Sequence, residues 1–317
     1  MAVEVDAGDR MLVRPAGTSA ASIGSDQYTD TDRGESVARR EHVQIKTAAE
    51  IAKMRVAGLL VAKTLARLRE AVAPGVTTAD LDAIAEKTIR ADGGIPSFKG
   101  YAQPPYPASI CSSVNNEVVH AIPTRKRVLR EGDIISIDCG AIVDGWHGDA
   151  AITVPVGEVA PEALDLIATC EGSLWAGLAA AQLGGKLTDI SAAVERHIRP
   201  HGYGIVDHYG GHGIGTEMHQ PPHVLNYGRP GRGIRLVEGL ALAIEPMITT
   251  GSPETSVLSD DWTVVTEDGS LAAHTEHSVA ITPRGPWVLT EPDGGVARLA
   301  ALGVACGQPA DAPSGIG

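Results

Sequence analysis

Residues 134–154 read IISIDCGAIVDGWHGDAAITV and decide the centre of the fold. Two runs rich in Ile, Val and Ala flank Asp144-Gly145, the dipeptide that most strongly predicts a two-residue β-hairpin turn. Apolar residues occupy both alternating sets of positions in the two runs, which is typical of strands covered on both faces. The sequence therefore predicts a long, buried hairpin.

Two aspartates of this hairpin are expected to lie close together. The two-residue turn makes Gly140 face Asp149 and Asp138 face Ala151, so the aspartates share one face, a diagonal step apart. Carboxylates at that separation repel each other unless a cation or a shared proton lies between them. A solvated sheet face is the alternative interpretation, and the apolar residues around the aspartates favour the buried one.

Helices are predicted on the N-terminal side of the hairpin. Thr47–Glu50 forms a capping box, followed by apolar residues at helical spacing that end at Pro74-Gly75. A second amphipathic helix is expected from Thr78 to near Gly93.

This pattern recurs 109 residues later, where Asp189 matches Asp80, and the preceding helix recurs at 161–181. Chance matching of two amphipathic helices is the alternative explanation. We expect a mobile extension at 1–42, a catalytic domain at 43–290 with halves at about 43–155 and 156–290, and a C-terminal tail at 291–317 with one short helix at 296–302.

Charge and composition exclude several classes of function. The 317 residues carry 26 Lys and Arg against 39 Asp and Glu, a net charge of −13 that excludes broad attraction to nucleic acid or anionic membranes. No apolar stretch reaches the roughly 18 residues of a membrane span, and the first residues lack a signal-peptide pattern. The four cysteines have no CxxC spacing, which predicts reduced thiols and a cytoplasmic protein.

Three further polar residues stand out from their surroundings. His212 lies in YGGHGIG, where glycines on both sides permit unusual backbone angles and a close approach of the ring to a ligand. Glu245 ends the apolar run LALAI and precedes a proline, which predicts a buried acid at a strand terminus. Glu276 is the one acid in the predicted strand HTEHSVAI, and alone it would be unremarkable because edge strands often carry charges. The nearby His208 and His223 are expected to be exposed and idle.

Together these residues form an oxygen-rich set with one nitrogen ligand. Such a set favours divalent manganese, iron or cobalt over a structural zinc site, which would use Cys and His. Its four carboxylates would be neutralised by two divalent cations, whereas one cation would leave excess negative charge. The predicted ligands are Asp138, Asp149, His212, Glu245 and Glu276.

Several blocks of the chain, in this order and spacing, resemble the type I methionine aminopeptidases. The blocks are VQIKTAAEIAKMRVAG, SICSSVNNEVVHAIP, GDIISIDCGAIVDGWHGDA, YGGHGIGTEMH, LAIEPM and DDWTVVTEDGSLAAHTEH. The resemblance covers about 43–290. It implies an α+β pita-bread fold, in which two α-β halves related by an approximate twofold axis surround a curved antiparallel sheet.

The resemblance also implies roles for the site residues. Asp149 and Glu276 would bridge two metal ions, Asp138 would complete one site, and His212 with Glu245 the other. A metal-bridging hydroxide would attack the first peptide bond and remove methionine when the second residue is small. Glu245 would act as general base, and His120 and His219 would hydrogen-bond the substrate and the tetrahedral intermediate.

A pocket for methionine is implied in the same way. Its aromatic residues fall in a short segment of an aromatic-poor chain, which is typical of a shaped site, although ordinary core packing would account for each residue singly. Two departures from the family concern this pocket: a longer loop between two tyrosines, and a methionine where an aromatic residue is common. The implied pocket residues are Phe98, Tyr101, Tyr106, Cys111, Met218 and Trp262.

The implied partners are the N-termini of newly made proteins and peptides, met near the ribosome by a monomeric enzyme without nucleic-acid or membrane affinity of its own. A proline-specific aminopeptidase of the same fold and a metal-free binding relative are the alternatives. A proline-specific enzyme would be expected to have more histidines than the loop GGHGIGTEMHQPP contains. A metal-free relative would be expected to lack one or more of the five ligands, all of which are present.

Overall fold

A computed structural model describes residues 43–309, so the extension expected at 1–42 and the end of the tail lie outside the described residues. Two pairs of helices are each followed by a run of antiparallel strands, and this segregation confirms the expected α+β class. The helices are α1 (Ala48–Ala71), α2 (Thr78–Ala91), α3 (Pro161–Ala180), α4 (Leu187–Ile198) and α5 (Val296–Ala301), with a 3-10 turn at Arg199–His201.

Most strands belong to one nine-stranded antiparallel sheet, ordered β1-β4-β5-β14-β9-β7-β8 with β2 on β4 and β15 on β14. Two three-stranded sheets, β13-β10-β6 and β11-β12-β3, complete the structure. The strands are β1 (Ile95–Pro96), β2 (Ile110–Val114), β3 (Glu117–Val119), β4 (Ile134–Val143), β5 (Trp146–Pro155), β6 (Gly204–Ile205), β7 (Gly211–Gly213), β8 (Gln220–Val224), β9 (Ala241–Ile244), β10 (Met247–Thr249), β11 (Thr255–Val257), β12 (Val264–Thr266), β13 (Ala272–His274), β14 (Glu276–Thr282) and β15 (Gly285–Val288).

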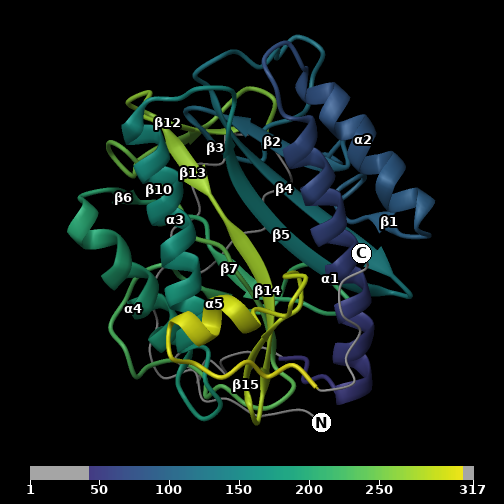
Figure 1. Ribbon diagram of the computed structural model, residues 1–317, viewed down its shortest axis with the longest axis vertical. Helices are drawn as coiled ribbons and strands as arrows, with labels where there is room; N and C mark the ends of the chain where they lie inside the picture. Colours follow the sequence, from purple (N-terminus) through teal and green to yellow (C-terminus); the bar gives the residue numbers. More distant parts are fainter. Residues whose placement is uncertain (1–42, 310–317) are drawn as a thin grey trace, which may run out of the picture.

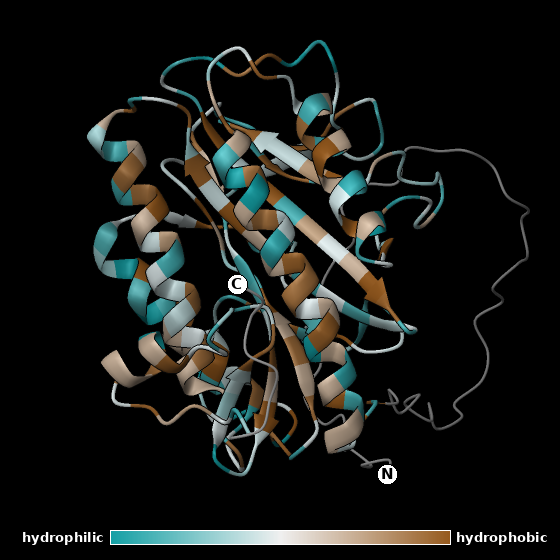
Figure 2. Cartoon of the chain, turned by 45° about the vertical axis from the view of Figure 1, so that its right-hand side comes forward, coloured by the Kyte–Doolittle hydropathy of each residue, from teal (hydrophilic) through white to brown (hydrophobic). Residues whose placement is uncertain are grey.

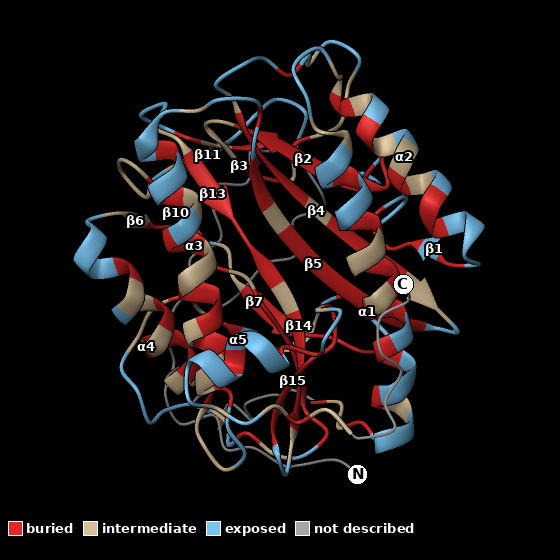
Figure 3. Cartoon of the chain, in the orientation of Figure 1, coloured by how far each residue is buried: buried red, intermediate tan, exposed pale blue. Residues whose placement is uncertain are grey.

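The central hairpin has the predicted register. Gly140 pairs with Asp149 and Asp138 with Ala151 along the β4–β5 ladder. Asp144 and Gly145 both have positive φ, at 49° and 79°, as the tight turn requires. Both strands are buried over most of their length, so the expectation of a pair covered on both faces is confirmed (Figure 3).

The helices form two pairs, with α1 and α2 beside β4 and β5 at the right of Figure 1 and with α3 and α4 at its left. Each helix alternates hydrophilic and hydrophobic residues along its length (Figure 2), and the exposed positions face outward. Two large apolar clusters result, one under α1 and α2 and one under α3 and α4. Leu299 of α5 is fully buried in the second cluster.

The first helix begins where the capping box predicts. The Thr47 side chain accepts a hydrogen bond from the Glu50 amide, and the Glu50 carboxylate accepts one from the Thr47 amide at 2.7 Å. The second helix begins at Thr78, and the short C-terminal helix covers nearly the predicted residues. Capping boxes therefore determine where α1 and α2 begin, whereas α5 begins without a side-chain cap.

Glycine allows α1 to lie directly against β5. A Cβ built on Gly148 would come within 2.7 Å of the Gly58 amide nitrogen of α1. Gly58 in turn approaches the Leu289 carbonyl too closely for a side chain. The backbone of α1 is thus held between β5 and the segment that follows β15.

Arg55 anchors the same helix from inside the protein. The side chain is fully buried, and its guanidinium donates hydrogen bonds to the carbonyls of Val288, Leu289, Glu291 and Pro292, at 2.6 to 3.2 Å. A buried charge is costly unless it is fully hydrogen-bonded, so Arg55 requires these carbonyls.

Replacement of Gly148 by alanine is expected to lower the free energy of unfolding by about 1–3 kcal/mol, because the added methyl must push α1 away from β5. Chemical denaturation of metal-free protein measures this change. The control is Val56→Ala, which truncates an exposed side chain of α1 and should cost less than about 0.5 kcal/mol. Equal stability of the Gly148 variant and the parent would contradict the close approach.

Candidate metal centre and active site

The five predicted ligands come from five strands that are consecutive neighbours in the large sheet. Asp138 lies on β4, Asp149 on β5, Glu276 begins β14, Glu245 directly follows β9, and His212 lies on β7. Neighbouring strands in a sheet are about 5 Å apart, so one residue from each can reach a common centre. The structure thus brings together residues that are far apart in the sequence.

The distances between their side chains are short enough for shared metal ligation. Ligand atoms of Asp149, His212 and Glu276 all lie within 4.8 Å of one another. His212 Nε2 is 3.5 Å from Glu245 Oε1. Asp138 and Asp149 are close enough for their carboxyl groups to hydrogen-bond each other when one is protonated.

A histidine that the sequence analysis did not assign also lies in this cluster. His274 is buried, and its Nε2 lies 3.6 Å from Glu245 Oε2. With Glu245 and Glu276 it forms a second group that could hold a metal ion. The signal in the sequence was its position two residues before Glu276, because alternate residues of an extended chain point to the same side.

The electrostatics of the cluster fit bound cations. Burial raises the pKa of Asp138, Glu245 and Glu276 well above the usual values, and the neighbouring carboxylates raise each of them further. Burial also raises the pKa of Asp149, to about 7. No Lys or Arg is among the groups that influence these four pKa values.

Several buried atoms of the cluster have no hydrogen-bond partner within residues 43–309. The atoms are Asp138 Oδ1, Asp149 Oδ1, Glu276 Oε1 and His274 Nε2. Buried polar atoms are nearly always hydrogen-bonded in proteins. Unpartnered carboxylate oxygens beside one neutral imidazole are therefore the donor set expected of a divalent metal centre.

The Ser278 side chain holds the main chain of Asp149 in place. The β5–β14 ladder pairs Glu276 with Ala151 and His277 with Ala150, and then stops. At the next position the fully buried Ser278 hydroxyl accepts from the Asp149 amide at 3.1 Å and donates to the Asp149 carbonyl at 2.8 Å. The Ser278 side chain thus takes the place of main-chain pairing at Asp149, one of the predicted metal ligands.

The glycines around His212 have a different role from the predicted one. Gly211 and Gly213 are not among the residues with positive φ, so the expectation of unusual backbone angles was wrong. A Cβ on Gly211 would instead collide with the Ala243 carbonyl, and one on Gly213 with the Pro221 carbonyl. Glycine is required here because β7 lies tightly between β8 and β9.

A cavity of about 420 Å³ opens over the cluster. Its lining includes Asp138, His212, Glu245 and His274 together with His120 and His219. The predicted substrate histidines therefore line the same cavity as three of the predicted ligands. His208 and His223 are exposed as expected, and both also line this cavity.

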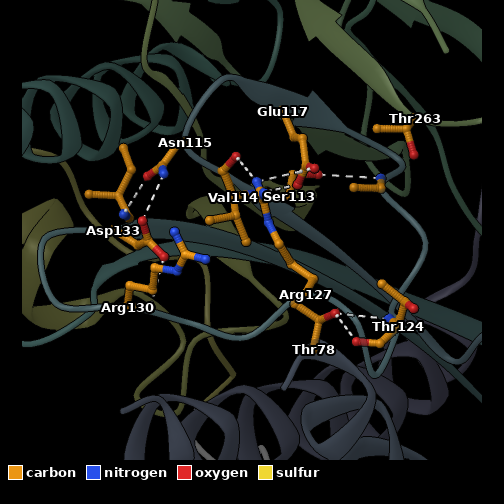
Figure 4. Close-up of polar contacts among 12 residues, drawn as sticks. Thr78, Ser113, Val114, Asn115, Glu117, Thr124, Arg127, Arg130, Asp133 and Thr263 are labelled. Carbon is orange, nitrogen blue, oxygen red and sulfur yellow. Dashed lines mark hydrogen bonds and ion pairs between the residues drawn. The ribbon is translucent and has the colours of Figure 1, made fainter. Parts of the chain in front are cut away.

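Polar contacts of the residues that precede His120 in the sequence fix the segment that carries it, and Figure 4 shows these contacts. Before it, Glu117 accepts from the Val114 amide at 2.7 Å and pairs with Arg127 at 3.2 Å. The Asn115 side chain donates to Asp133 Oδ1 at 2.8 Å. His120 itself has a φ of 61°, and burial lowers its pKa to about 4, which keeps the ring neutral.

Most of the implied methionine-pocket residues form one apolar cluster. Phe98, Tyr106, Cys111 and Met218 are buried together, and Trp262 packs against them with its ring 5.0 Å from that of Tyr106. Cys111 pairs with Asp138 across the β2–β4 ladder, so the cluster adjoins the carboxylates.

Tyr101 lies outside this cluster. Its side chain is 38% exposed, and its hydroxyl lies 2.6 Å from Nδ1 of His219.

The M24 metallopeptidase family model matches residues 52–283. The chain belongs to this family. A methionine aminopeptidase of Clostridium acetobutylicum is 54% identical over 78% of the chain and 98% of its own length. Methionine aminopeptidase 1 of Mycobacterium tuberculosis is 50% identical over 79% of the chain and 96% of its own length. Within the family, the chain groups with the type I methionine aminopeptidases.

Solved structures confirm the pita-bread fold. The methionine aminopeptidase of Thermotoga maritima is 39% identical, with a TM-score of 0.77 over 78% of this chain and 99% of that one. A prolidase from Pyrococcus furiosus has a TM-score of 0.64 at 22% identity, which shows a common fold alone. Within residues 43–309, no helix of this M24 metallopeptidase combines the length and apolarity needed to cross a bilayer.

Metal removal is expected to make the melting temperature fall as the pH rises. The folded-state pKa of Asp149, about 7, lies above its ordinary value of 3.8, so the folded protein holds a proton that the unfolded chain releases. The stability linked to this proton is fully present below about pH 3.8 and is lost as the pH rises toward 7. The gain in melting temperature on adding Mn²⁺ should therefore increase from about pH 5 to 7.5.

Differential scanning calorimetry of chelated and Mn²⁺-loaded protein at several pH values measures this gain. Asp149→Asn, which cannot ionise, should flatten the pH dependence of the metal-free protein. A gain from Mn²⁺ that is the same at all pH values would contradict the assignment of these carboxylates to the metals.

Proposed function

We propose that the protein removes the N-terminal methionine from newly made proteins and peptides whose second residue is small. Its membership of the M24 family and its 54% identity to a methionine aminopeptidase support this activity. The observation that carries the proposal is the set of five ligand residues on or directly after adjacent strands. Three of their carboxylates have a buried oxygen without a hydrogen-bond partner, and Asp138, His212 and Glu245 line a cavity.

Two divalent metal ions, Mn²⁺, Fe²⁺ or Co²⁺, would occupy the cluster. Asp149 and Glu276 would contribute to both metal sites, Asp138 to one of them, and His212 with Glu245 to the other. The 3.5 Å separation of His212 from Glu245 and the contact of Asp138 with Asp149 support this division. When bound, the ions lower the pKa of a water molecule and polarise the peptide carbonyl.

The side chains of the protein bind and orient the peptide and move the proton. Glu245 takes the proton of the attacking water on a carboxylate oxygen, and His212 and His274 lie on either side of that carboxylate. His120 and His219 hydrogen-bond the peptide along the wall of the cavity. Burial lowers the pKa of both rings, so both are neutral hydrogen-bonding groups.

The apolar cluster receives the methionine side chain. Phe98, Tyr106 and Trp262 supply rings, and Cys111 and Met218 supply sulfur, which together suit a flexible thioether. Because Cys111 lies directly across from Asp138, a side chain in this cluster places the first peptide bond over the metals. The enzyme acts as a monomer in the cytoplasm, close to the ribosome where new N-termini emerge, and its four free cysteines fit that reducing compartment.

Protein loaded with Mn²⁺, Fe²⁺ or Co²⁺ is expected to release methionine from Met-Ala-Ser and Met-Gly peptides. Glu245→Gln should lower kcat by about 10²- to 10⁴-fold, because the amide cannot accept the proton. Glu238→Gln, at an exposed acid remote from the cluster, is the control and should leave kcat unchanged.

Methionine release followed by chromatography, with metal content measured on the same samples, tests both statements. No cleavage with any of the three metals would overturn the proposed function. Substantial activity of the Glu245 variant at full metal content would instead remove Glu245 from the role of base.

A further inference from the structure

Two neighbouring histidines of the site use their Nδ1 atoms in opposite ways. The rings of His212 and His219 lie 4.4 Å apart in an edge-to-face arrangement. His212 Nδ1 lies 3.0 Å from the Gly213 carbonyl oxygen. A carbonyl oxygen can only accept, so the hydrogen of the neutral His212 ring is on Nδ1, and the lone pair of Nε2 faces Glu245. This is the tautomer of a metal ligand.

The Nδ1 atom of His219 has a hydroxyl as its partner instead of a carbonyl. The Tyr101 hydroxyl lies 2.6 Å from His219 Nδ1, and the two rings are 5.1 Å apart. A phenol hydroxyl can donate a hydrogen bond as well as accept one, and partial burial raises the pKa of Tyr101, so the phenol keeps its proton. The Tyr101 hydroxyl therefore has a hydrogen to donate to His219 Nδ1.

The loop that carries Tyr101 holds the hydroxyl in this position. The Tyr101 amide donates to the Phe98 carbonyl at 2.9 Å, and the Tyr106 amide donates to the Tyr101 carbonyl at 2.9 Å. The Gly100 amide closes the loop on the Tyr106 carbonyl at 2.8 Å. The two tyrosines at the ends of this loop therefore point to different places, Tyr106 into the apolar cluster and Tyr101 to His219.

We infer that the Tyr101 hydroxyl donates its hydrogen bond to Nδ1 of His219 and so keeps the imidazole hydrogen on Nε2, which makes His219 a hydrogen-bond donor toward peptide oxygen in the cavity. Tyr101 is then a positioning residue that acts through His219, and not a wall of the methionine pocket. This inference rests on the proposed function for the identity of the peptide. The assignment of the tautomer stands on the contacts alone.

The contrast between His212 and His219 explains how two nearby histidines can act differently, one as a metal ligand and one as a hydrogen-bond donor. A ring whose Nδ1 is held by an acceptor offers a lone pair, and a ring whose Nδ1 is held by a donor offers a hydrogen. Without the hydroxyl, the neutral His219 ring would be free to place its hydrogen on either nitrogen. A lone pair on Nε2 would then face the peptide oxygen and repel it.

Long-range proton–nitrogen NMR of protein with nitrogen-15-labelled histidine reads the tautomer directly. Zn²⁺-loaded protein at about pH 7.5 is the sample, because Zn²⁺ is diamagnetic, and His219→Gln assigns the signals. We expect His219 to carry hydrogen on Nε2 in the parent and to become a mixture of tautomers in Tyr101→Phe. A parent ring with hydrogen on Nδ1, or a tautomer that is unchanged in the variant, would overturn the inference.

Kinetics of the Mn²⁺-loaded enzyme provide the second readout. Tyr101→Phe should lower kcat about tenfold, with KM and metal content nearly unchanged, because a donor to the developing oxyanion is lost. In a His219→Ala background the same substitution should have no further effect. Tyr203→Phe, which removes a hydroxyl bonded to Asp165 far from the cavity, is the matched control. Independent effects of Tyr101→Phe and His219→Ala would overturn the inference.

The two proposals fail in different ways. A protein that shows the expected His219 tautomer and yet releases no methionine would contradict the proposed function alone. An active enzyme whose His219 tautomer does not depend on Tyr101 would contradict the inference alone.

Discussion

Electrostatic repulsion among four carboxylates is the constraint on which this structure depends. Asp138, Asp149, Glu245 and Glu276 meet in an interior where no Lys or Arg influences their pKa values. A buried, unpaired carboxylate is costly, so the surrounding fold must hold these groups together against their charge. The wide sheet does so by placing one ligand on each of five adjacent strands, and Ser278 reinforces it at Asp149. Divalent cations then convert the repulsion into attraction.

Sequence reasoning succeeded where local chemistry decides the structure. The register of the β4–β5 hairpin follows from Asp144-Gly145, because a two-residue turn with two positive φ angles leaves one pairing. The capping box at Thr47 likewise determines the start of α1. The adjacency of Asp138 and Asp149 could therefore be derived from the residues themselves.

The rest of the site depends on the order of strands in the sheet, which local patterns do not encode. That β14 lies beside β5, and β9 beside β14, joins Asp149 to Glu276 and Glu245. Sequence reasoning proposed this set from the kind of residue and its place in a strand or loop, but the division of the ligands between two metal ions came only from the resemblance to a known family. The roles of His274 and Ser278 were not predicted. The contact of Tyr101 with His219 was not predicted either, because it joins residues 118 positions apart in the sequence. The glycines beside His212 were predicted to allow unusual backbone angles, whereas they are needed because neighbouring carbonyls leave no room for a side chain. Such crowding cannot be read from the sequence.

The buried Arg55 has a consequence for how the chain is made. Its helix is among the first elements to be synthesised, but the carbonyls that accept its hydrogen bonds belong to residues 288–292. Until those residues have left the ribosome, the guanidinium has none of these acceptors, and burying it would be costly. The first α-β half therefore cannot complete its packing during most of translation. Final closure of this fold around its metal ligands has to wait for the end of synthesis.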